Sequence, residues 1–153
     1  MWRVIDSLFL GDKHDSLDIG KCKAAGITHI VNCARECESA YPESFDYLNL
    51  ELKDPDTGLQ QKLFEVLEYV DAAREHGAVL VHCSGAISRS PSVVLAYLIY
   101  RGQSIDNAVA SIRNVVQTRP NYIFIEQVLN HFGIPHSRSD SKAIMETLSA
   151  PSN

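Results

Sequence analysis

A short segment in the middle of the chain, from His82 to Ser90, carries the residue types of a nucleophilic phosphate site. Cys83 and Arg89 enclose five residues that are mostly small, namely Ser84, Gly85, Ala86, Ile87 and Ser88. A loop of small residues can point successive backbone N–H groups at one centre, and a helix that begins behind it adds free donors and its positive dipole end. The segment therefore predicts a cup that binds a phosphate dianion.

Each polar side chain at the ends of the loop has a part in such chemistry. The donors of the cup would stabilise a thiolate at Cys83, which could then attack phosphorus. The planar fork of Arg89 can hold two phosphoryl oxygens, which a lysine cannot do. Ser90 could donate to the cysteine sulfur as it leaves, and His82 would orient the loop. A cysteine at the end of a buried strand is more often a packing residue, but the combination favours catalysis.

Strands and helices alternate along the chain and place this segment between a buried strand and a helix. The pattern predicts edge strands over 2–5 and 8–10 and further strands over 28–32, 45–50 and 78–81, with helices near 17–25, 59–76, 89–101, 104–115 and 122–132. This order predicts an α/β fold with a central, mostly parallel twisted sheet flanked by helices. Ligands of such sheets bind at the carboxyl ends of the strands, where the loop would lie.

The chain divides into one domain and a short polar segment. Residues 1–135 are predicted to form the catalytic domain around a single core. Residues 136–153 are polar and rich in serine, and we expect a mobile C-terminal tail with a weak helical tendency over 142–148.

Charge and composition narrow the possible partners. The net charge of −5 disfavours a general binder of nucleic acid or anionic membrane, and the longest apolar run is too short to span a bilayer. No paired C-x-x-C spacing is present, which favours a reducing compartment, cytoplasmic or nuclear. We expect a soluble protein and a monomer.

The sequence resembles the dual-specificity branch of the protein tyrosine phosphatases over roughly residues 2–132. The residues that carry the resemblance are 7–11, 26–32, the signature loop within 81–92, and 119–121, where the asparagine, here Asn121, helps to brace that loop. The resemblance implies the small type without a docking domain and a two-step mechanism through a phosphocysteine, with no metal and no other cofactor.

The same resemblance implies an aspartate that protonates the leaving oxygen and then activates water. Asp54 lies 29 positions before Cys83, directly after a predicted strand, and Asp56 is the second candidate. Residues 54–58 would also make a good turn without any chemistry. Asp54 is the first choice.

One position departs from the family pattern. The family expects glycine three residues after the cysteine, where this chain has Ala86, with Gly85 one place earlier. If the backbone at 86 needs a positive φ, alanine would cost about 1–2 kcal/mol. A weakly active or silent phosphate-binding module is therefore the alternative function.

The expected substrates are phosphoproteins or phosphopeptides that carry phosphotyrosine, phosphoserine or phosphothreonine, with phosphate, sulfate or vanadate as anions of the site. The loop holds no lysine or histidine, which disfavours phosphoinositides and triphosphorylated RNA, and a glucan or lipid phosphatase ranks third. Cys33 and Cys37 are candidates for a disulfide with oxidised Cys83.

Overall fold

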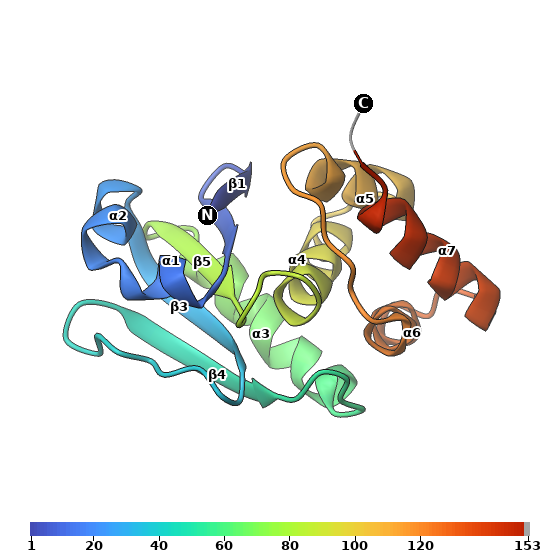
Figure 1. Ribbon diagram of the computed structural model, residues 1–153, viewed down its shortest axis with the longest axis horizontal. Coiled ribbons are helices and arrows are strands. Elements are labelled where there is room, and N and C mark those ends of the chain that lie inside the picture. Colours follow the sequence, from blue (N-terminus) through green and yellow to red (C-terminus); the bar gives the residue numbers. More distant parts are fainter. Residues whose placement is uncertain (152–153) are drawn as a thin grey trace.

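A five-stranded sheet forms the centre of the computed structural model, which describes residues 1–151 (Figure 1). The strand order is β1-β2-β5-β3-β4, with bounds β1 (Trp2–Ile5), β2 (Leu8–Gly11), β3 (Ile27–Ala34), β4 (Asp46–Leu52) and β5 (Ala78–His82). Neighbouring strands are parallel except for β1, which pairs antiparallel with β2. The predicted α/β class and mostly parallel sheet are confirmed.

The prediction that residues 8–10 form an edge strand is wrong. β2 is paired on both sides, with β1 along one edge and β5 along the other, so β1 and β4 are the edges of the sheet. The two short runs were indistinguishable by length, but Leu8 and Leu10 are fully buried, as expected for an interior strand.

Helices cover both faces of the sheet (Figure 1). The short helices α1 (Lys13–Leu17) and α2 (Ile19–Ala24) lie on one face, while α3 (Leu59–Ala73) and α4 (Arg89–Tyr100) pack on the other. Three further helices, α5 (Ile105–Arg113), α6 (Tyr122–His131) and α7 (Arg138–Ser149), pack beyond α4. The larger core lies between the sheet and α3 and α4.

The central strand β5 is buried along its whole length, which fixes the point from which the signature loop emerges. Val79 and Leu80 are fully buried, and each such side chain contributes about 1.5–3 kcal/mol. Gly77 allows the chain to enter this strand, because a Cβ at that position would lie 2.5 Å from the Thr28 side chain. Within residues 1–151, none of the helices is long and apolar enough to cross a membrane.

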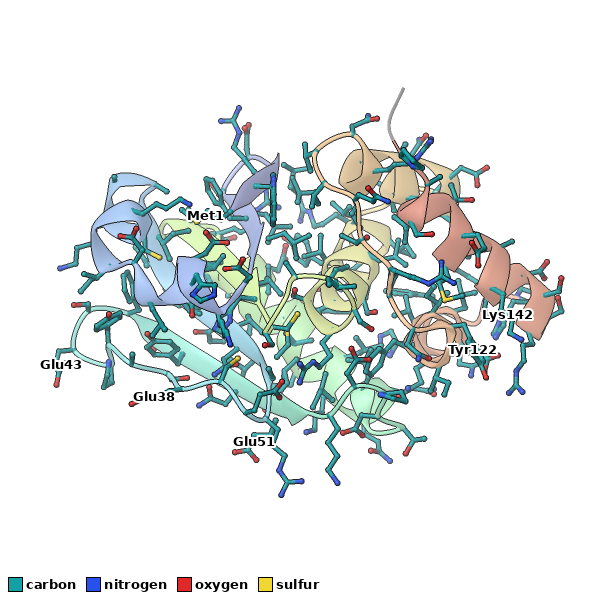
Figure 2. All side chains as sticks on the ribbon, viewed as in Figure 1. Met1, Glu38, Glu43, Glu51, Tyr122 and Lys142 are labelled. Atoms are coloured by element: carbon teal, nitrogen blue, oxygen red, sulfur yellow. The ribbon has the colours of Figure 1, made fainter. Side chains whose placement is uncertain are left out.

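The expectation of a mobile tail is wrong for residues 138–149, which form α7. Ser137 caps this helix reciprocally with Asp140, and Leu148 is fully buried. Lys142 places its ammonium 5.0 Å from the ring centroid of Tyr122 on α6. Figure 2 labels both residues, which lie on the neighbouring helices α7 and α6. The helix therefore packs on the domain instead of extending from it.

Candidate active site

The loop between β5 and α4 turns its carbonyl groups outward and leaves its N–H groups free. Ser84 O accepts from Lys13 N at 3.0 Å, and Ile87 O accepts from Arg119 N at 2.8 Å. Among residues 1–151, no backbone N–H of 84–89 donates to a protein acceptor. Free backbone N–H groups in a loop that leads into the N-terminus of a helix are suited to a bound anion.

Ala86 adopts the left-handed conformation, with φ of 58°, and is only 2% exposed. The position thus requires the backbone geometry that glycine adopts without cost, and alanine takes it with its methyl group packed inside the protein. Alanine at this position therefore strains the loop.

Cys83 lies at the base of the loop, 2% exposed, with its sulfur 3.1 Å from Ser90 Oγ. The preceding His82 is fully buried, and its Nδ1 lies 3.2 Å from Cys83 O. Because a carbonyl can only accept, Nδ1 carries the hydrogen. Burial lowers the pKa of His82, which favours the neutral ring, and Nδ1 of this ring holds the backbone of Cys83.

Arg89 uses part of its N–H donors in bonds to Glu36 and Leu52 and has others without a protein partner. Its two terminal nitrogens each donate to one carboxylate oxygen of Glu36 at 2.6 Å, and Nη1 also donates to Leu52 O at 3.0 Å. Nε is buried and has no partner among the described residues. Since Nε and Nη2 share one edge of the planar group, that edge keeps one free hydrogen on each nitrogen, which suits two phosphoryl oxygens.

Glu36 is a site residue that the sequence analysis missed. Its hydrogen bonds to Arg89 lower its pKa from 4.5 to about 2, so the carboxylate stays charged at neutral pH. The Glu36 side chain is 56% exposed while the Arg89 side chain is 7% exposed, so the acidic partner lies on the solvent side of the pair.

Ser88 connects three parts of the site. Its hydroxyl donates to Asp54 Oδ1 at 3.0 Å and accepts from Asn121 N at 2.9 Å. The expected contact of Asn121 with the loop is present, but its backbone makes it, because the side chain caps α6 by accepting from Ile123 N. The Ser88 hydroxyl is therefore occupied by its bonds to Asp54 and Asn121. The backbone N–H of Ser88 is the group that can donate to phosphate.

The two candidate acids differ in what their carboxylates do. Asp56 accepts from Lys53 N at 2.9 Å and from Gly58 N at 2.8 Å, and the first of these bonds is the main cause of its lowered pKa. Asp56 thus shapes the turn. Asp54 is exposed, contacts the signature loop through Ser88, and lines a cavity of about 420 Å³ with Arg89.

The comparisons with known proteins agree with this geometry. The family model described as "Dual specificity phosphatase, catalytic domain" matches residues 8–134. The chain belongs to the dual-specificity phosphatase family. It is 34% identical over 136 residues to the human protein phosphatase Slingshot homolog 3, covering 86% of this chain and 21% of that protein. The chain thus spans about a fifth of the length of this curated relative.

Two solved structures of dual-specificity phosphatases are similar over nearly their whole length. Human DUSP28 superposes with a TM-score of 0.80 and 29% identity, covering 86% of this chain and 94% of that one. A mouse putative dual specificity phosphatase complexed with zinc tungstate also has a TM-score of 0.80, with 28% identity and coverage of 94% and 90%.

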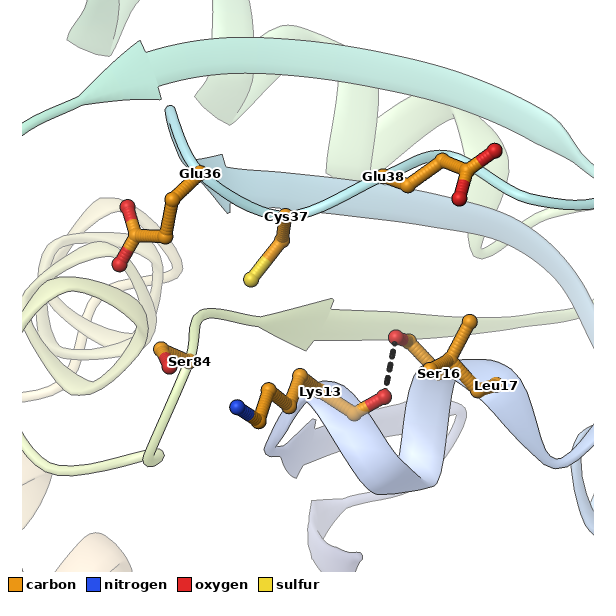
Figure 3. A pocket seen from close by; sticks show the side chains of 7 residues that line it. All are labelled: Lys13, Ser16, Leu17, Glu36, Cys37, Glu38 and Ser84. Atoms are coloured by element: carbon orange, nitrogen blue, oxygen red, sulfur yellow. Dashed lines mark hydrogen bonds between the residues drawn. The ribbon is translucent and has the colours of Figure 1, made fainter.

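Beside the signature loop of this dual-specificity phosphatase domain lies a second pocket, of about 200 Å³. Figure 3 shows Glu36 and Ser84 at one end of it and Leu17 at the other, with Cys37 between. Cys33 is fully buried, and burial raises the pKa of both thiols, which makes them weak nucleophiles. All four cysteines are free, so the disulfide with Cys83 stays a prediction.

Two further cavity residues, Arg35 and Lys53, were also missed by the sequence analysis. Each is the first residue after a strand, β3 or β4, so each lies at the carboxyl edge of the sheet, where ligands of this fold class bind. The available signal was their position directly after a strand, which the sequence analysis applied only to the signature loop and to Asp54.

Proposed function

We propose that the chain is a protein phosphatase that hydrolyses phosphotyrosine, phosphoserine and phosphothreonine through a cysteinyl-phosphate. The observation that carries the proposal is the convergence of Cys83, the free N–H groups of the loop and the unpartnered Nε of Arg89 beside a cavity that Asp54 also lines. Membership of the family and the loop geometry support the same reaction.

In the first step, the thiolate of Cys83 attacks phosphorus and the bond to the leaving oxygen breaks. Asp54 gives its proton to that oxygen, so the substrate leaves as a neutral alcohol or phenol. The loop amides and the free edge of Arg89 stabilise the charge that develops on the three phosphoryl oxygens.

In the second step, water attacks the phosphorus of the cysteinyl-phosphate while Asp54, now a carboxylate, takes a proton from that water. The sulfur–phosphorus bond breaks and inorganic phosphate is released. Ser90, at 3.1 Å from the sulfur, donates its hydroxyl hydrogen and so stabilises the departing thiolate.

A shallow site supports dual specificity. The cavity in front of Arg89 opens to solvent, and Ile87 at its loop is 56% exposed, so short and long phosphorylated side chains can both reach the cup. We further propose that the substrates are phosphoproteins and that phosphate, sulfate or vanadate occupies the same cup. A monomeric state, a signalling role and a cytoplasmic or nuclear location complete the proposal.

The test is hydrolysis of para-nitrophenyl phosphate with a chelator present, comparing wild type with Cys83→Ser, Asp54→Asn and Asp56→Asn. Cys83→Ser should abolish turnover. Asp54→Asn should lower kcat by about 10²–10⁴-fold, the usual contribution of a general acid. Asp56→Asn should lower stability more than kcat, because its carboxylate holds two backbone N–H groups.

A covalent intermediate is the decisive readout. Acid quenching during turnover followed by mass spectrometry should find phosphate on the peptide that contains Cys83. Vanadate binding without any turnover or covalent phosphate would overturn the proposal and favour the silent binding module.

A further inference from the structure

Two cationic side chains lie at the mouth of the site and have no role in the two-step reaction proposed for it. Arg35 and Lys53 line the cavity of about 420 Å³ together with Asp54 and Arg89. They are brought together by the sheet, because Ala34 and Leu52, the last residues of β3 and β4, are paired, and each cation is the first residue after its strand. Arg35 N also donates to Leu52 O at 3.0 Å, which fixes the two backbones at this edge.

The other charged side chains that line the cavity already have hydrogen-bond partners within the protein. Glu36 and Arg89 form a bidentate pair, and the Asp54 carboxylate accepts from the Ser88 hydroxyl. Arg35 and Lys53 are exposed, and within residues 1–151 neither side chain makes a hydrogen bond or a salt bridge. Two positive charges therefore remain beside the cup after its own chemistry has been accounted for.

The protein surface around Arg35 and Lys53 is acidic, so their positive charge is confined to the mouth of the site. The chain has a net charge of −5, and Figure 2 shows Glu38, Glu43 and Glu51 along the same side of the molecule, on and before β4. An anion that approaches this acidic surface finds attraction at the mouth of the site and repulsion beside it.

We infer that Arg35 and Lys53 form a subsite for a second anionic group of the substrate, a carboxylate or a second phosphoryl group a few residues from the phosphorylated side chain. The inference rests on the proposed function and narrows its substrate class to acidic or multiply phosphorylated peptide segments. A peptide fits better than an inositol head group, because the exposed Ile87 offers apolar contact to a peptide side chain, which a polyhydroxylated head group cannot match.

The size of the effect follows from the exposure of the two cations. Solvent-exposed ion pairs contribute about 0.2–1 kcal/mol each. Two of them correspond to a preference of roughly two- to thirtyfold in kcat/KM, expressed mainly in KM. The preference should fall as salt is raised from about 0.05 to 0.5 M, because exposed charges are screened.

The experiment uses one phosphotyrosine peptide scaffold with three sets of flanking residues: neutral, two glutamates, or one phosphothreonine. Wild type is compared with Arg35→Gln/Lys53→Gln and with Arg3→Gln/Lys23→Gln, which makes the same change in net charge at two exposed cations outside the cavity. kcat and KM are measured for each peptide and for para-nitrophenyl phosphate.

The expected result is that wild type and Arg3→Gln/Lys23→Gln prefer both acidic peptides, whereas Arg35→Gln/Lys53→Gln processes all three peptides alike. A preference limited to the phosphothreonine peptide would identify the second group as phosphoryl. An equal preference in wild type and Arg35→Gln/Lys53→Gln, or an equal loss in both double variants, would overturn the subsite.

Two further measurements separate this inference from the proposed function. Peptide affinities for the Cys83→Ser variant, measured by fluorescence polarisation, report the subsite even if no peptide is hydrolysed. Phosphatidylcholine vesicles that contain phosphatidylinositol phosphates provide the other class of substrate. Release of phosphate from these vesicles at a higher kcat/KM than from any peptide would overturn the assignment to peptides.

Discussion

Replacing Ala86 with glycine tests whether the signature loop is strained. An alanine held in the left-handed region costs about 1–2 kcal/mol, and glycine would remove that cost. Against this gain stand the loss of a buried methyl group, about 0.8 kcal/mol, and the greater freedom of glycine in the unfolded chain, about 0.4–1 kcal/mol. The three contributions nearly cancel, so Ala86→Gly should change the free energy of unfolding by less than about 1 kcal/mol.

Ala96 provides the matched control, because it is equally buried but lies inside α4 with ordinary helical geometry. Ala96→Gly loses the methyl group and about 0.8–1.0 kcal/mol of helix propensity, without any relief of strain, and should cost about 2 kcal/mol. For a domain of this size the control should melt roughly 4–8 °C lower, and Ala86→Gly within about 3 °C of wild type.

The assay is urea unfolding followed by circular dichroism, combined with para-nitrophenyl phosphate kinetics. An Ala86→Gly variant as unstable as Ala96→Gly would refute the strain argument. Turnover should stay within a few-fold of wild type, since glycine and alanine would hold the same loop path. A gain of more than about tenfold would mean that alanine distorts the cup, contrary to our reading of the loop.

Three other predictions concern the supports of the site. Glu36→Gln should lower kcat/KM by about two- to fivefold, as expected for a partly exposed ion pair, with Glu38→Gln unchanged; equal rates would show that Leu52 O alone orients Arg89. Ser88→Ala should slow alkyl phosphates more than aryl phosphates with good leaving groups, because it frees Asp54; a uniform loss would contradict this. Burial lowers the pKa of His82 below 6.5, so the unfolded state binds the extra proton as pH falls. The unfolding free energy should therefore drop from pH 7 to 5 more steeply in wild type than in His82→Asn, and parallel curves would exclude His82 as the cause.

The sequence predicts those features that depend on local pattern. The strand before His82 and the helix from Arg89 follow from apolar periodicity, whereas the choice of Asp54, which lines the cavity, rests on the family resemblance. The Glu36–Arg89 pair could not be predicted in this way, because its members lie 53 positions apart and no periodicity relates them.

The sequence indicated a weak helical tendency over 142–148, which lies within α7, but the start of this helix and its packing on the domain were missed although a local signal was present. Ser137 and Asp140 have the spacing of a capping box, but the polar composition that follows was interpreted as a tail. Only Leu148 and Ser141 become fully buried there, so hydrophobic pattern alone was too weak to predict that this helix packs on the domain.

The attachment of α7 has a consequence for how the protein matures during synthesis. Thr118 N donates to Leu148 O, the Arg119 side chain contacts Glu146 and Ser149, and Arg119 N holds the Ile87 carbonyl of the signature loop. A nascent chain that still lacks residues 138–149 has its nucleophile and arginine but not the last support of the loop between them. Full competence should therefore be reached only after this helix has left the ribosome, which delays phosphatase activity until the domain is folded.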